Sequence, residues 1–203
     1  MKPQICFVLC MLFCSCSKNE SPVASTPTQN GVIVPLAKGN YWVGRVFEFD
    51  TSGNTTASYY DTIKVFSDSG SWGENQCWVT NRPNTLWSNS DVGLLEWNSS
   101  SPPVGATPYL IARYPCRDGE VFSTGFDHVA RAVNIPGVGK AIEGKGTFPE
   151  IYYWTRALPP RPALELDAFC PNIGPSEIKK YYYTLSGAMY NAYAWELVDY
   201  SLK

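Results

Sequence analysis

Apolar and polar residues alternate with a period of two along much of the chain, and this alternation predicts strands. The first run, residues 41–49, carries Tyr41, Val43, Phe47 and Phe49 on one face, with Arg45 between them. Turn residues at 50–54 predict a hairpin that returns through a strand at 58–66, ending before Asp68-Ser69-Gly70. We see no window with sustained helical spacing and caps, so we expect an all-β protein.

Further short apolar runs follow, and turn residues separate them. They lie at 77–79, 85–87, 94–97, 109–114, 129–135, 140–143, 151–155, 178–184 and 193–200. Pro136-Gly137-Val138-Gly139 predicts a turn, and 185–188 joins the last two runs as a hairpin. Strands at this spacing favour a single antiparallel meander over βαβ units.

The composition supports this interpretation. The chain has 7 Trp, 13 Tyr and 9 Phe together with 16 Gly and 16 Pro, a combination that favours short strands joined by turns. The formal net charge is −2, and no basic stripe or charge block is present. We therefore expect no nucleic-acid partner.

The N-terminal stretch has the pattern of an export signal. Lys2 supplies a positive charge, residues 5–13 form an apolar run, and small residues follow. The apolar run is too short to cross about 30 Å of hydrocarbon as a helix. We expect a signal peptide at 1–15, a flexible tether at 16–35 that reaches roughly 20–25 Å, and one domain at 36–203.

Phe13-Cys14-Ser15-Cys16 resembles the lipobox of bacterial lipoproteins, in which cleavage precedes a cysteine that carries diacylglycerol. The resemblance implies that Cys16 bears diacylglycerol and a further acyl chain such as palmitate, which would make the membrane a stable partner. Ser17 is not the Asp that retains some lipoproteins at the inner membrane, so the implied location is the outer membrane, facing the periplasm or the surface. The alternative is an ordinary secretory signal that is cut after Ser15 or Ser17.

Few residues point to catalysis. His128 is the only histidine, and Asp127 would orient it as a general base only if the two side chains met. Neighbours in a strand point to opposite faces, so the side chains of Asp127 and His128 need not meet. We expect His128 to be a loop residue without a catalytic role. The sequence has no nucleophile elbow and no paired metal-ligand motif. We expect that the protein is not an enzyme and that it has no catalytic residue, no metal site and no cofactor.

Three cysteines, Cys77, Cys116 and Cys170, lie in the domain expected at 36–203. An exported protein meets an oxidising environment in which a disulfide persists. Cys116 and Cys170 lie beside prolines at the ends of runs, where a bridge is sterically easier, and Cys77 fits a small buried position. A Cys116–Cys170 bridge and free thiols both remain open.

Consecutive aromatic residues at 152–154 and 181–183 must face both sides of a sheet. The outward members offer ring faces to a ligand, and Tyr153, Trp154 and Tyr182 are the candidate stacking residues. The alternative is that both faces of the sheet are covered and these rings belong to the packing.

Four motifs in order resemble those of a group of uncharacterised bacterial envelope lipoproteins. Pro35-Leu36 with Gly39-Asn40-Tyr41-Trp42 matches a PLxxGNxW opening, Tyr114-Pro115 with Gly119 matches YPxxxG, and Gly146-Thr147-Phe148 matches GTF. Residues 171–179, which begin Pro171-Asn172-Ile173-Gly174, and Trp195-Glu196-Leu197-Val198 resemble a closing PGVG…ELV hairpin, although Pro175-Ser176 is inserted. The resemblance implies a strongly curved open sheet or half-barrel, and it supplies no catalytic residues.

These observations indicate a lipid-anchored envelope protein with a binding or structural role. One alternative is a surface protein that contacts carbohydrate through aromatic rings. Another is a carrier that holds an apolar ligand in a concave sheet. An envelope protein remains a third kind of partner, and a hydrolase has the least support.

Overall fold

The structure is a computed structural model that describes residues 32–72, 75–82, 85–97, 107–125, 128–157, 164–184 and 186–203. Every regular element in these ranges is a strand. The strands are β1 (Tyr41–Phe49), β2 (Thr55–Trp72), β3 (Asn75–Thr80), β4 (Leu86–Ser90), β5 (Gly93–Trp97), β6 (Tyr109–Arg113), β7 (Val121–Gly125), β8 (His128–Ile142), β9 (Gly146–Ala157), β10 (Leu164–Cys170), β11 (Gly174–Tyr183) and β12 (Met189–Ser201). In the described ranges there is no helix with the length and apolar character that crossing a bilayer would require.

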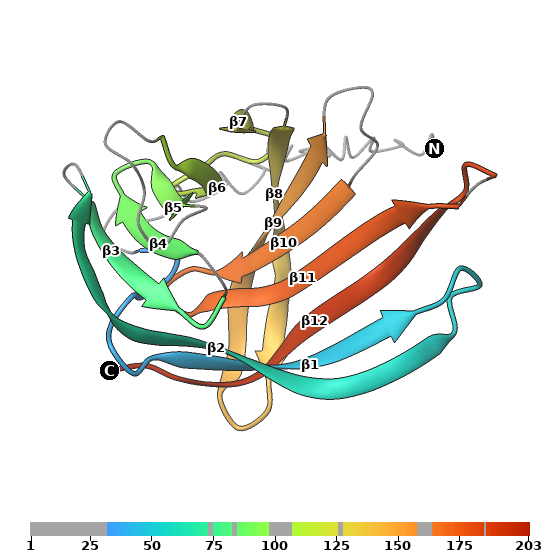
Figure 1. Ribbon diagram of the computed structural model, residues 1–203, viewed down its shortest axis with the longest axis horizontal. Helices are drawn as coiled ribbons and strands as arrows, with labels where there is room; N and C mark the ends of the chain where they lie inside the picture. The colour runs from blue at the N-terminus through green and yellow to red at the C-terminus, as the bar shows by residue number, and fades with distance from the viewer. Residues whose placement is uncertain are drawn as a thin grey trace, which may run out of the picture.

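The twelve strands form one antiparallel sheet in the order β6-β5-β4-β3-β2-β1-β12-β11-β10-β9-β8-β7. The first and last strands pair with each other, so two meanders, β1–β6 and β7–β12, join at the middle of the sheet. The sheet curls strongly around its concave side (Figure 1). This architecture confirms the predicted all-β antiparallel meander with a strongly curved sheet.

The curvature brings the two edge strands, β6 and β7, against each other and nearly closes the sheet. The ring of Tyr109 packs over Gly125, where an added Cβ would lie 2.2 Å from the ring. Arg113 ends β6 and Glu120 precedes β7, and Arg113 Nε lies 3.3 Å from Glu120 Oε1. Side chains therefore hold this seam together, whereas a backbone ladder joins the other neighbouring strands.

The core fills the concave side and is centred on two tryptophans, Trp42 and Trp195, which are both fully buried. Trp195 packs directly over Gly44, where a Cβ would lie 1.9 Å from the indole ring. Glycine is therefore needed in the middle of β1 so that the backbone can approach the ring closely.

In β1, the buried face is the one that carries Trp42, Gly44 and Val46. The alternating set at Tyr41, Val43, Phe47 and Phe49 is only partly buried, so the more regular apolar pattern marks the outer face of this strand. The sequence pattern does not show which face of β1 is buried, because apolar residues occupy both faces.

The segment before β1 is part of the domain. Ile33 and Val34 are buried in the core, and Asn89 Nδ2 donates to Val34 O at 2.9 Å. The fully buried Asn40 ties the segment before β1 to residue Lys203, since its Nδ2 donates to Pro35 O at 2.8 Å and its Oδ1 accepts from the backbone N–H of Lys203 at 2.9 Å. The tether predicted to extend to residue 35 therefore overlaps the domain at its last residues.

Several strand boundaries also differ from the predicted ones. β2 continues through Asp68-Ser69-Gly70, with register irregularities between residues 65 and 70. β8 runs through residues 136–139, where we expected a turn, and the pairing with β9 shifts there before the chain turns at 143–145. The two strands that the sequence did not suggest are β7 and β10.

Candidate functional site: the concave cavity

The inward face of the sheet carries two parallel rows of side chains across β9, β10, β11 and β12. Paired residues Tyr153, Asp167, Ile178 and Trp195 form the deeper row, and the burial of Tyr153, Ile178 and Trp195 shows that this face points inward. The second row lies two residues away on each strand and consists of Thr155, Glu165, Lys180 and Tyr193. Because side chains alternate between faces, this mostly polar row points to the same side as the apolar one.

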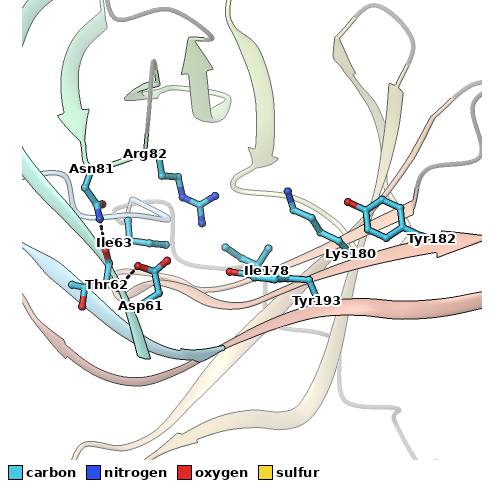
Figure 2. A pocket seen from close by; sticks show the side chains of 9 residues that line it. All are labelled: Asp61, Thr62, Ile63, Asn81, Arg82, Ile178, Lys180, Tyr182 and Tyr193. Carbon is cyan, nitrogen blue, oxygen red and sulfur yellow. Dashed lines mark hydrogen bonds between the residues drawn. The ribbon is translucent and has the colours of Figure 1, made fainter. Parts of the chain in front are cut away.

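These rows border a cavity with two chambers, which we call the concave cavity (Figure 2). The larger chamber has a volume of about 400 Å³ and is lined by Asp61, Thr62, Ile63, Asn81, Arg82, Ile178, Lys180, Tyr182 and Tyr193. The smaller chamber has a volume of about 160 Å³ and is lined by Arg82, Trp87, Glu96, Ile111, Glu165, Asp167, Phe169, Pro175, Ile178 and Lys180. Arg82, Ile178 and Lys180 line both chambers, so these three residues mark where the chambers adjoin.

A short segment after β3 places Arg82 at this junction. The neighbouring Asn81 is tied to β2 on both sides of its amide, since Nδ2 donates to Thr62 O at 2.5 Å and Oδ1 accepts from the backbone N–H of Lys64 at 2.9 Å. The Arg82 guanidinium lies 5.9 Å from the centre of the Trp87 ring, within cation–π range. In Figure 2 the guanidinium of Arg82 and the ammonium of Lys180 extend into the space above Ile178 from opposite walls.

The carboxylates of the cavity differ in their partners. Glu96 Oε2 accepts a hydrogen bond from Trp87 Nε1 at 3.0 Å, and Glu165 Oε1 lies 3.7 Å from Lys180 Nζ. The Asp61 carboxylate, which is exposed, accepts from the backbone N–H of Thr62 at 2.8 Å. Each of these three carboxylates therefore has a donor within its own neighbourhood.

Asp167 is the unusual carboxyl group. Loss of water around it raises its pKa from 3.8 to about 7, and the nearby negative charges of Glu165 and Glu96 act in the same direction. The positive charges of Arg82 and Lys180 oppose this rise without cancelling it. Near neutral pH, Asp167 is therefore protonated in part of the molecules.

The three predicted stacking residues lie in three different environments. Tyr182 is 51% exposed and lines the larger chamber, with its ring 6.5 Å from that of Tyr190. Trp154 is on the outer face of the sheet, packed 6.0 Å from the Tyr181 ring. Of the three, Tyr182 is thus the one that lines the cavity.

Tyr153 is wholly buried, so the prediction that it offers a ring face to a ligand is wrong. Its hydroxyl donates to Arg113 O at 2.6 Å, and its ring packs edge-on against Phe122 and Phe169. The sequence did not show which alternate residues of β9 face outward. Residues 151, 153 and 155 point into the concave side, and the core fills the deep end of that side.

Cys116 and Cys170 are both free and buried, so of the two alternatives that the sequence left open the structure has free thiols and no Cys116–Cys170 bridge. Cys116 Sγ lies 3.6 Å from the Tyr153 hydroxyl, at the end of the β6–β7 seam. Cys170 ends β10, where burial raises the pKa of its thiol to about 12. Both thiols are therefore held in their protonated, unreactive form.

His128 is the first residue of β8 and pairs with Gly125 and Ala157, which corrects its predicted place in a loop. Asp127, its proposed partner, lies outside the described residues, as do Cys16 and the signal peptide. Within the described ranges no group of three or more His, Cys, Asp or Glu side chains is arranged to hold a metal ion.

Sequence reasoning missed most of the cavity. Glu165 and Asp167 belong to the unpredicted β10, although Leu164, Leu166 and Ala168 alternate with them and form a detectable strand pattern. Arg82 occurs in a segment that the sequence indicates only as a turn. Lys180 and Tyr193 fall within predicted strands, but nothing in the sequence aligns them across β11 and β12.

Comparison with known proteins gives a distant structural similarity. The chain matches no protein-family model, and no curated protein is similar to it in sequence. A crystal structure of a "putative lipoprotein" from Parabacteroides distasonis covers 84% of this chain and 99% of its own, with 12% identity and a TM-score of 0.39. At this identity and TM-score the similarity carries no argument about function.

Proposed function

We propose that this chain is a lipid-anchored protein of the bacterial outer membrane that binds a saccharide in its concave cavity without converting it chemically. The anchor is supported by the export signal at 1–15 and the lipobox-like sequence that ends at Cys16. The observation that carries the binding role is the concave cavity, in which an exposed tyrosine adjoins charged and hydrogen-bonding side chains.

The lining chemistry favours a polar ligand over an apolar one. The two chambers contain four carboxyl groups, Asp61, Glu96, Glu165 and Asp167, and two cationic side chains, Arg82 and Lys180. Burying these groups under a hydrocarbon chain would remove their water without supplying partners, at a cost of several kcal/mol. A sugar ring satisfies both kinds of lining, since its hydroxyls bond polar groups and its C–H face packs on tyrosine.

Membership of the envelope lipoprotein group that the sequence resembles is part of this proposal. Its opening and closing motifs meet in the fold, since Trp42 Nε1 donates to Ile173 O at 2.5 Å and the Trp42 ring covers Gly174. A Cβ on Gly174 would lie 2.6 Å from that ring, so Trp42 can take this position only with a glycine at 174. This contact gives a physical reason for the two motifs to occur together.

The test is a titration of the mature domain with neutral and acidic oligosaccharides and, separately, with phospholipid vesicles. We expect calorimetry, or a change in the total tryptophan fluorescence to which Trp87 of the smaller chamber contributes, to report saccharide binding and no vesicle binding. Tyr182→Ala should weaken saccharide binding about 3- to 10-fold through loss of one ring contact. Tyr183→Ala is the matched control, because Tyr183 is similarly exposed at 44% and is the next residue along β11.

Binding of phospholipid or fatty acid in place of saccharide would support the apolar-carrier alternative and contradict the proposal. Equal effects of Tyr182→Ala and Tyr183→Ala would place the saccharide outside the concave cavity.

A further inference from the structure

The charges of the concave cavity are not evenly matched with partners. Glu96, Glu165 and Asp61 each accept from, or lie beside, a donor, as described above. Among the described residues no carboxylate forms an ion pair with Arg82. Arg82 is therefore a cavity cation without an ion pair among the described residues, and the carboxyl group whose charge it influences, Asp167, has a raised pKa and is only partly ionised near neutral pH.

Lys180 adds a second positive charge to the same space. Its contact with Glu165 is long, at 3.7 Å, and its side chain is 42% exposed, so the pair is a loose one. Arg82 and Lys180 both line both chambers and extend toward each other from opposite walls (Figure 2). Two cations that face each other across a cavity repel, and an anion between them removes that repulsion.

The Arg82 guanidinium is suited to a planar oxyanion. Its fork of N–H donors matches the two oxygens of a carboxylate, whereas an ammonium such as Lys180 adds a compact charge from the other side. Tyr182 and Tyr193 line the same chamber and leave room beside the cations for the ring that would carry the acid.

We propose that the saccharide held in the concave cavity is an acidic one, whose carboxylate lies between Arg82 and Lys180. This inference rests on the proposed saccharide-binding function and adds the chemical class of the ligand. Tyr182 contacts the sugar ring, and the two cations select the acid group.

The same geometry couples binding to a proton. Asp167 is faced by Glu165 on its own strand, by Glu96 on β5, by Lys180 on β11 and by Arg82 after β3. A ligand carboxylate that occupies the two cations opposes the charge of Asp167, so the ligand prefers the protonated form of this residue. Affinity for an acidic saccharide should therefore rise as the pH falls from 8 to 6, a range in which a sugar carboxylate stays ionised.

The experiment uses trigalacturonic acid, its methyl ester and neutral galactotriose, titrated by calorimetry into the mature domain. We expect the acid to bind at least about 10-fold more tightly than the ester, with added salt weakening this preference. Arg82→Gln and Lys180→Gln should each reduce affinity for the acid by about 10-fold or more and leave ester binding nearly unchanged. Lys64→Gln is the matched control, since Lys64 is exposed and follows the cavity residue Ile63 on β2.

Each outcome is decisive. Tighter binding of the acid, lost in both cavity variants and kept in Lys64→Gln, supports the inference, and an Asp167→Asn variant without the pH dependence supports it further. Equal binding of all three probes, unaffected by Arg82→Gln and Lys180→Gln, overturns the acidic class and leaves saccharide binding standing. Failure of all three probes to bind the folded wild-type protein overturns both. If Arg82→Gln does not fold, Lys180→Gln alone decides.

Discussion

At the scale of single residues, two tyrosines show how strongly the depth of a position within the curved sheet determines its exposure. Tyr153 is fully buried and Tyr182 is half exposed, although each lies within a run of consecutive aromatic residues and on the inward face. The difference comes from depth, since Tyr153 sits where Phe122 and Phe169 fill the curve of the sheet and Tyr182 sits where the curve is open.

Tyr153→Phe should lower the free energy of unfolding by about 1–3 kcal/mol, because it leaves Arg113 O buried without its donor. Tyr182→Phe is the control and should change stability by less than about 0.5 kcal/mol. Chemical denaturation measures both. Equal effects of the two substitutions would contradict the buried hydrogen bond.

Asp167 makes stability depend on pH in a definite direction. Its pKa is raised in the folded state, so the folded protein holds the proton more tightly than the unfolded chain does. The stability contributed by this proton is complete below about pH 4 and is lost as the pH rises through about 7.

As the pH rises from 5 to 8, the free energy of unfolding should therefore fall less in Asp167→Asn than in the wild type. The difference should be about 1–2 kcal/mol, because partial contact of this side chain with solvent reduces the effect. Thermal unfolding at the two pH values measures this difference. Asp91→Asn, in the exposed turn between β4 and β5, is the control that should follow the wild type. A parallel pH profile for wild type and Asp167→Asn would show that this carboxyl group titrates normally.

At the scale of elements, the alternation of residues was sufficient for most strands and for the antiparallel meander. β1 and the hairpin of β11 and β12 were predicted within a few residues because their patterns are clear and turn residues bound them. Pro136-Gly137-Val138-Gly139 looked like a turn because local propensity favours one, but pairing with β9 carries β8 through this segment with a shifted register.

The candidate site was less predictable, for a physical reason. It consists of residues such as Arg82, Asp167 and Lys180 that meet only through strand register and through the bend that brings the segment after β3 over β11. Local sequence does not encode register across a curved sheet. Tyr182 was found because aromatic clustering is a local signal.

Gly44→Ala should lower the free energy of unfolding by about 1–3 kcal/mol or more, since the new methyl group on β1 would meet the Trp195 ring on β12. Gly53→Asn, in the β1–β2 turn, has open space and a positive φ that asparagine tolerates, so it should cost little. Denaturation midpoints compare them. A neutral Gly44→Ala would mean that the Trp195 ring is free to move away.

At the scale of the whole molecule, the backbone contact of Val32 with Asn172 shows where the chain enters the domain. Val32 O accepts from the backbone N–H of Asn172 at 2.8 Å, so the chain enters the sheet beside the β10–β11 turn. In Figure 1 this turn lies at the opposite end of the sheet from the hairpins that join β1 to β2 and β11 to β12. Tyr182, near the end of β11, therefore lies away from the point where the proposed tether joins the domain.

Cys16→Ser should abolish lipidation and block cleavage before residue 16, so the N-terminal peptide should carry no diacylglycerol and should still contain residues of the signal. Mass spectrometry of the N-terminal peptide measures this directly. The wild-type mature chain is expected to begin at Cys16 with diacylglycerol attached. A mature N-terminus at another residue would favour the ordinary secretory signal.

The most direct test of saccharide binding is mass spectrometry of the full chain purified gently from its host under native conditions. The wild-type protein is predicted to retain a carboxylate-bearing saccharide, and a folded Arg82→Gln/Lys180→Gln variant is predicted to lose it. A phospholipid or fatty acid retained equally by both proteins, or no saccharide on the wild type, would contradict the account.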